Sequence, residues 1–210
     1  MDGINHTFES LIANNYLVED IVTSNHKYIF ILESPHKDEL IHGFPVSGSA
    51  GKGMTRIILD YQLSEALGIL IGNQRFYDHQ LVLSRIGLMN VCQIPLQASA
   101  YSIEHQEQYK EFLEILEGLR INYMQFKHRS EAWNMTRAII TNKLKERLER
   151  LTEQSCTIIP CGRFADQYLK DTNISSPAWE VIEDIPHPAR NQWSNGSIKD
   201  RIENILNTPS

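Results

Sequence analysis

The chain has 210 residues, of which 41% are hydrophobic and 22% are charged, with a formal net charge of −6 at pH 7. This composition is typical of a soluble globular chain that can bury its own core, so we expect residues 1–210 to form a single domain. The acidic charge argues against a protein that grips nucleic acid over its whole surface.

No apolar run approaches the ~20 residues that a transmembrane helix needs. The first residues, MDGINHTFES, lack the basic start and the apolar core of a signal peptide. We therefore expect a cytoplasmic protein that does not contact membranes.

Three cysteines, Cys92, Cys156 and Cys161, lie far apart or inside apolar segments. An odd number without Cys-x-x-Cys spacing argues against a disulfide framework, a zinc site or an iron–sulfur cluster. The sequence therefore predicts buried free thiols, no metal and no cofactor.

The first half of the chain alternates between helical and strand patterns. Apolar residues at helical spacing predict a helix over His6–Ile21, and the apolar run Lys27–Leu32 predicts a buried strand. The next segment, Glu33–Lys52, reads as a long loop, and such loops inside compact domains are usually functional. Helical spacing returns over Gly53–Ile71 and is followed by a second strand, Ile86–Gln93.

The second half continues the alternation, with Ser102 as a plausible helix cap. It predicts helices over Ser102–Leu119, Ala132–Leu151, Phe164–Leu169 and Ser197–Leu206, and strands over Ser155–Pro160 and Trp179–Ile185.

Strands that alternate with helices predict an α/β fold, here a three-layer α/β/α sandwich around a four-stranded parallel sheet. In such sheets, ligands bind beyond the carboxyl ends of the strands. Polar residues follow each predicted strand, so we expect them to converge at one edge of the sheet. These groups are Glu33–His36, Asn90–Gln93, Cys161–Arg163 and His187–Arg190.

The segment GFPVSGSAGKGM, Gly43–Met54, is rich in small residues and leads into a predicted helix. It does not match a Walker A loop, because Val46 stands where the first glycine belongs and Gly53 stands where Ser or Thr belongs. Backbone N–H groups of small residues can still approach a phosphate at the positive end of a helix dipole. The alternative interpretation is a flexible loop that caps a helix.

Three polar residues after the strands are candidates for chemistry. Glu33 either caps a backbone N–H or takes part in a reaction. His187 lies between two prolines, so its backbone is held in one geometry, and a neutral imidazole there can stabilise developing negative charge. The amide of Asn90 offers one acceptor and two donors, which suits it to reading the edge of a base. The alternative for His187 and for Asn90 is a structural role in a turn.

Basic residues concentrate in one part of the chain. Between Arg120 and Arg150, eight Lys or Arg face three Glu, whereas Ser102–Leu119 carries five Glu and one Lys. The basic segment predicts either a solvated helix face or a local phosphate-binding face.

Read in order, ILESPHKDE, GFPVSGSAG, GLMNVCQ, IIPCGRFA and IPHPAR resemble the motif series of the uracil-DNA glycosylase superfamily. The layout is most similar to its thermophile-type branch, known as family 4. There a strand ends in Gly-Glu-Ala-Pro-Gly, and Gly-x-Pro-Phe-Val-Gly-x-Ala-Gly follows. A strand with Asn-Val, an apolar strand ending in Gly and a His-Pro-Ser loop complete the series. The similarity extends from Ile31 to Arg190, over most of the chain.

The resemblance implies a role for each matched residue. Glu33 would position the attacking water, and His187 would stabilise the departing base anion, as the two catalytic residues. The residues implied in binding the base are Ser34, Pro35, His36, Phe44 and Asn90. Those implied in contacting the DNA backbone are Gly48, Ser49, Gly51, Lys52, Gly162, Arg163, Pro188 and Arg190.

The chain also departs from the pattern of that branch, mainly in the base pocket. Leu32 replaces a Gly, Ser34 replaces an Ala, and His36 replaces a Gly or Tyr. Val46 stands where a Phe is expected to stack on the base, and Phe44 is the nearby substitute. The iron–sulfur cysteines of that branch are absent, and HPARNQW lacks the second Pro of the final motif. The resemblance therefore supports the scaffold better than it supports uracil as the substrate.

The function that the resemblance implies is a DNA glycosylase-like hydrolase of the base excision repair type. It would cleave the N-glycosidic bond of a flipped-out uracil or other modified base in single- or double-stranded DNA. The alternative is a catalytically inactive protein that binds nucleic acid or a nucleotide on the same scaffold.

Overall fold

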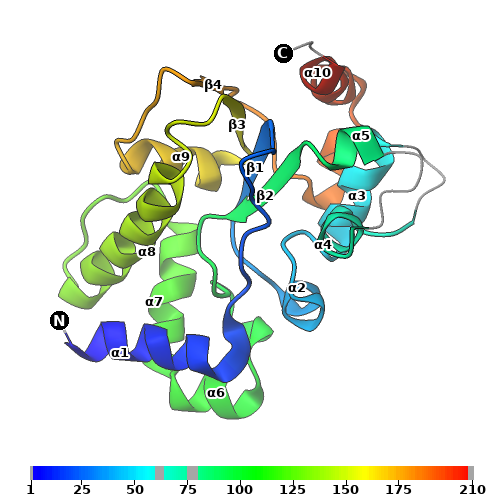
Figure 1. Cartoon of the computed structure of the whole chain (residues 1–210). Helices are drawn as coiled ribbons and strands as arrows, with labels where there is room; N and C mark the ends of the chain where they lie inside the picture. The colour runs from blue at the N-terminus through cyan, green and yellow to red at the C-terminus, as the bar shows by residue number, and fades with distance from the viewer. Residues whose placement is uncertain (1, 60–63, 75–79, 208–210) are drawn as a thin grey trace.

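A four-stranded, all-parallel sheet forms the centre of the molecule (Figure 1). The computed structural model describes residues 2–59, 64–74 and 80–207. The strand order is β2-β1-β3-β4. The strands are β1 (Tyr28–Leu32), β2 (Ile86–Asn90), β3 (Cys156–Pro160) and β4 (Trp179–Val181).

The chain leaves β1 toward β2 on one side and later returns to β3 on the other side of β1. This reversal places the topological switch point of the sheet beside β1. The register aligns Leu32 with Asn90 and Ile31 with Pro160, so the carboxyl ends of β1, β2 and β3 lie level. A binding site is therefore expected beyond this edge.

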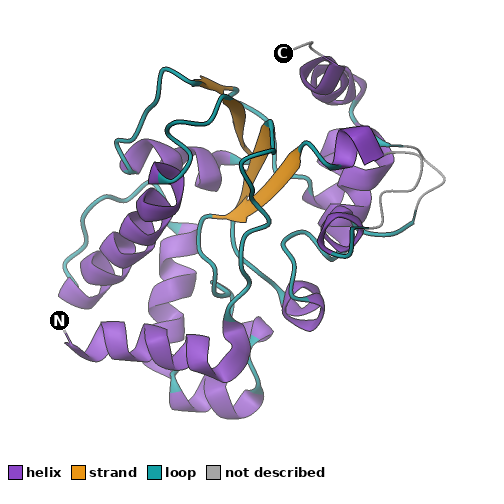
Figure 2. Cartoon of the chain, viewed as in Figure 1, coloured by secondary structure: helices purple, strands orange, loops and turns teal. Residues whose placement is uncertain are grey.

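Helices cover both faces of the sheet, as Figure 2 shows. One layer contains α1 (Asp2–Leu11), α7 (Lys110–Ile121), α8 (Glu131–Glu149) and α9 (Arg163–Asp171). The other contains α3 (Ser49–Ile58), α4 (Leu67–Gly72), α5 (Gln80–Leu83) and α10 (Gly196–Asn207). A short helix, α2 (Lys37–His42), follows β1. Another short helix, α6 (Ile103–Gln108), precedes α7.

The alternation of side chains along β1 explains the two layers. Ile29 and Ile31 enter one core together with α1, α7, α8 and α9. Phe30 and Leu32 enter the other core with α3, α4 and α10. Every residue of β1 is buried, as expected for a strand covered on both faces. The predicted three-layer α/β/α sandwich with a four-stranded parallel sheet is confirmed.

The predicted long loop Glu33–Lys52 is wrong, because it contains α2 and the start of α3. Local capping stabilises α2. The Glu39 carboxylate accepts a hydrogen bond from the backbone N–H of His36 at the N-terminus of the helix. Gly43, with φ +75°, ends the helix in the left-handed conformation.

Two predicted helices are each divided in the structure. Gly53–Ile71 becomes α3 and α4, and residues 60–63 of that prediction lie outside the described residues. Ser102–Leu119 becomes α6 and α7, which meet at Tyr109. The predicted cap is confirmed, because the Ser102 side chain accepts a hydrogen bond from the His105 N–H at 3.2 Å.

Other predicted boundaries move by a few residues. The first helix ends in an irregular turn at Tyr16 rather than at Ile21, and Asn15 in this turn has φ 64°. β2 ends at Asn90 and β4 at Val181, so both strands are shorter than predicted. The three cysteines are buried and free, as predicted. In the described part of the chain, no helix combines the length and apolar character needed to cross a membrane.

Candidate active site

A pocket of about 450 Å³ opens at the carboxyl end of the sheet. Its lining comes from the segments that follow β1, β2 and β4, from the turn before α3, and from α7. Among the predicted site residues, it brings together Glu33, Ser34, His36, Gly48, Ser49, Asn90, His187 and Arg190. The predicted convergence of strand-end residues is therefore confirmed for β1, β2 and β4.

His187 is held in one orientation and one tautomer. Its Nδ1 accepts a hydrogen bond from the backbone N–H of Ala189 at 3.2 Å. A backbone N–H can only donate, so the neutral ring carries its proton on Nε2. Nε2 makes no hydrogen bond within the described residues and belongs to a side chain that lines the pocket. The ring therefore offers one free N–H donor to a ligand.

The surroundings of His187 favour the neutral ring. Burial lowers the pKa of His187, and the Arg120 guanidinium acts in the same direction, whereas the Glu33 carboxylate opposes them. A neutral imidazole is therefore expected at pH 7.

Gly162 packs directly against His187. Its φ is +91°, and its N–H donates to the Ile185 carbonyl at 2.7 Å. A Cβ at this position would lie 3.0 Å from the Cβ of His187. Glycine is therefore needed here for conformation and space, whatever the ligand.

Glu33 forms an ion pair with Arg120, whose Nε donates to its Oε1 at 2.5 Å. Glu33 follows β1, whereas Arg120 comes from the last turn of α7, 87 residues later. The side chains are 21% and 37% exposed, so the pair is only partly shielded from solvent. Arg120 lines the same pocket and was missed as a site residue, because the sequence placed it only in a basic segment.

Asn90 is fully buried at the end of β2. Its main-chain carbonyl accepts a hydrogen bond from Arg147 at 2.7 Å, and Arg147 also pairs with Asp20 at 2.8 Å. Its side-chain Nδ2 donates to Oε1 of Glu39 at 3.4 Å. Its Oδ1 is buried and has no hydrogen-bond partner in the described structure.

Glu39 is a further residue that sequence reasoning did not select. Besides the N–H of His36, its carboxylate accepts the N–H of Val46 at 2.7 Å. Burial raises the pKa of Glu39 to about 7, against the effect of these hydrogen bonds. The signal in the sequence was its position three residues after the helix cap, where Glu commonly bonds back to the cap.

The predicted role of Phe44 requires correction. A Cβ on Gly72 of α4 would lie 2.5 Å from Phe44 ring atoms, so the ring packs directly on that glycine. Phe44 does not line the pocket, and neither does Pro35, which is buried. Val46 lines the pocket instead, with a φ of 50° that is unusual for a β-branched residue.

The residues predicted to contact the DNA backbone fall into separate groups. Gly48, Ser49 and Arg190 line the pocket, whereas Gly162 and Arg163 line an adjoining pocket of about 520 Å³ that also includes His187. Lys52 is exposed on α3 and Pro188 is buried, and neither lines either pocket. Gly51 is also buried, and a Cβ at this position would meet the Val46 carbonyl, so its predicted contact with the DNA backbone stays a prediction.

Part of the basic segment is engaged within the protein. Arg137 forms a largely buried ion pair with Asp171, and Arg147 forms one with Asp20. These two arginines stabilise the α8 layer, so they are not part of the phosphate-binding face that the sequence left open.

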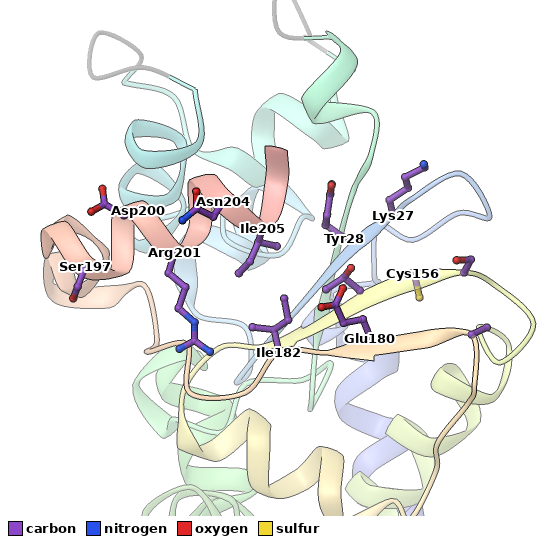
Figure 3. A pocket seen from close by; sticks show the side chains of 13 residues that line it. Lys27, Tyr28, Cys156, Glu180, Ile182, Ser197, Asp200, Arg201, Asn204 and Ile205 are labelled. Carbon is purple, nitrogen blue, oxygen red and sulfur yellow. The ribbon is translucent and has the colours of Figure 1, made fainter. Parts of the chain in front are cut away.

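A larger cavity, of about 700 Å³, lies near the amino ends of β1 and β3 (Figure 3). Tyr28, Cys156, Ile182 and Arg201 are among its lining residues, and α10 contributes one wall. None of the predicted site residues lines it. Parallel sheets bind ligands at the opposite edge, beyond the carboxyl ends of their strands. The candidate active site is therefore the pocket of about 450 Å³ that contains Glu33, Asn90 and His187.

Neither a family model nor a curated protein sequence matches the chain. Within the described ranges, no group of three or more His, Cys, Asp or Glu side chains is arranged to hold a metal ion.

Proposed function

We propose that this protein is a DNA glycosylase-like hydrolase, which cleaves the bond between a flipped-out modified base and its sugar. The observation that carries the proposal is the convergence of Glu33, Asn90 and His187 on one pocket from three different strand ends. These are the three residues to which the motif resemblance assigns water positioning, base recognition and stabilisation of the leaving base.

The reaction breaks the C1′–N bond, whose electron pair leaves with the base. The enzyme first expels the nucleotide from the stack, at a cost of a few kcal/mol. The Nε2–H of His187 then donates a hydrogen bond to the developing base anion, without transferring its proton. A neutral, preorganised donor in a partly buried site stabilises such a charge strongly, because little reorganisation is needed.

Water forms the new C1′–O bond and releases a proton, which neutralises the departed base anion through solvent, so that the products are the neutral base and an abasic sugar. Glu33 accepts a hydrogen bond from this water and stabilises the positive charge that develops on the sugar. Its ion pair with Arg120 at 2.5 Å restrains the carboxylate in one position. We therefore assign Glu33 to positioning and charge stabilisation, and Arg120 to holding Glu33 in place.

The Glu33–Arg120 ion pair predicts that substitutions of the two residues have non-additive effects on the excision rate. Glu33→Gln is expected to reduce the excision rate by about 10²-fold, the lower range for a residue that acts on an attacking water. Arg120→Met is expected to reduce it less, because the carboxylate remains. The double variant should be no slower than Glu33→Gln, because Arg120 acts through Glu33. Single-turnover rates test this, and multiplicative losses would show that Arg120 acts on the substrate independently.

The second candidate function is a protein that binds nucleic acid or a nucleotide on this scaffold without cleaving it. Two observations favour it: Val46 rather than an aromatic ring lines the pocket, and the net charge is −6. Oligonucleotides that carry modified bases distinguish the two functions. Abasic product supports the hydrolase, whereas saturable binding without abasic product supports the alternative.

A further inference from the structure

The Glu39 carboxylate is fixed by three donors from three segments of the chain. Oε2 accepts from the N–H of His36 at 2.9 Å, and Oε1 accepts from the N–H of Val46 at 2.7 Å. The third donor is Nδ2 of Asn90 at 3.4 Å, also to Oε1. Since the first two donors belong to the main chain, the carboxylate cannot turn away from Asn90 without losing them.

The contact with Glu39 decides which end of the Asn90 amide remains free. An amide nitrogen only donates and an amide oxygen only accepts, and an ionised carboxylate only accepts. Nδ2 therefore donates to Glu39, and Oδ1 is the end of the amide that makes no contact with the carboxylate. Oδ1 is buried and without a partner in the described structure, on a residue that lines the pocket. A buried acceptor in this state is costly unless a ligand donates to it.

We propose that Glu39 is a specificity-positioning residue, which occupies the donor half of the Asn90 amide and leaves its acceptor half to read the ligand. The site then selects a base that presents an unsubstituted ring N–H or an amino group to Oδ1. Asn90 does not also donate to a carbonyl oxygen of the base, because Nδ2 is already engaged. This inference rests on the proposed function in taking a nucleobase as the ligand, but it concerns binding rather than cleavage.

Oligonucleotides that differ only at one ring nitrogen test the proposal. One pair carries uracil or N3-methyluracil, and the other carries hypoxanthine or N1-methylhypoxanthine. Affinity is measured by fluorescence anisotropy at about pH 8, above the pKa of about 7 for Glu39, so that the carboxylate is ionised. In at least one pair, the wild type should bind the N–H base at least about 10-fold more tightly than its methylated partner.

Two variants separate a hydrogen-bond effect from a steric one. Glu39→Gln has the same shape but offers an N–H as well as a carbonyl, so it no longer dictates which end of the amide it holds. This variant should reduce the ratio of affinities toward 1. Asn90→Leu, which removes Oδ1 at similar size, should do the same, and it keeps the test valid if Glu39→Gln does not fold.

The matched control is Lys37→Gln, because Lys37 lies two residues before Glu39 on α2 and is exposed but does not line the pocket. This variant should keep the wild-type ratio. Equal affinities within both pairs, a ratio unchanged in Glu39→Gln and Asn90→Leu, or no binding of either N–H base would overturn the proposal. Selective binding without abasic product would instead contradict only the proposed hydrolysis.

Discussion

Replacing His187 with alanine is expected to slow base excision by about 10²–10³-fold, the usual loss when one preorganised donor to a developing anion is removed. The structure gives the reason. Nδ1 accepts the Ala189 N–H, so the proton of the neutral ring lies on Nε2 of a side chain that lines the pocket. Single-turnover rates on a cognate oligonucleotide measure the effect, and an unchanged rate would contradict this role.

Two controls make the His187 result specific. His187→Gln restores an N–H donor on a side chain of different shape, so it should retain more activity than His187→Ala. His6→Ala, which changes an exposed histidine on α1, should leave the rate unchanged. The affinity for the oligonucleotide should change less than the rate in His187→Ala, because the anion that His187 stabilises forms only during the reaction.

The pH dependence of excision should also report the state of His187. Because burial lowers the pKa of this ring below the usual 6.5, the neutral form persists as the pH falls through 6.5. Protonation at a lower pH adds a positive charge and fixes a proton on Nδ1, which then opposes the N–H of Ala189. The contribution of His187 is measured as the ratio of the wild-type excision rate to the His187→Ala rate at each pH. This ratio should therefore stay constant down to pH 6.5 and fall only below it.

Gly51→Ala is expected to produce the largest loss of stability among the glycine substitutions in α3. A Cβ at this position would lie 1.6 Å from the carbonyl oxygen of Val46 and 2.7 Å from its carbon. Both are backbone atoms, so the turn at Val46 or the helix has to move. Overpacking of this kind typically costs about 1–3 kcal/mol and sometimes more.

Gly53→Ala is the matched control, because it lies two residues further along the same helix. Its nearest neighbour would be the Pro188 carbonyl oxygen at 3.5 Å, which is an ordinary contact. Alanine should stabilise the helix there by about 1 kcal/mol. Urea denaturation of both variants should therefore give free energies of unfolding on opposite sides of the wild-type value. A neutral or stabilising Gly51→Ala would show that the turn does not lie against α3.

The main layers of the fold could be predicted because their signals are local. The run YIFIL forms β1 with every residue buried, and the Ser102 cap begins α6 as predicted. The positions of Asn90 and His187 at one edge follow from parallel topology alone. The division of helices was harder to predict, because apolar spacing continues through Tyr109 while the backbone there leaves the helical conformation.

The contacts that organise the pocket could not be read in the same way, because they join distant segments. Arg120 reaches Glu33 across 87 residues, and Asn90 reaches Glu39 across 51. Phe44 illustrates the opposite error. An aromatic residue beside a glycine-rich segment suggested a stacking surface for a base, but the bare backbone of Gly72 on α4 provides the surface on which it packs.

The most direct test of the proposed function is an excision assay on single- and double-stranded oligonucleotides that contain uracil, hypoxanthine, xanthine or a modified cytosine. Abasic sites are detected as strand breaks after alkali treatment. The wild type should release at least one of these bases, and His187→Ala should release it about 10²–10³-fold more slowly. Binding to these oligonucleotides with no abasic product from any of them would contradict the assignment as a hydrolase.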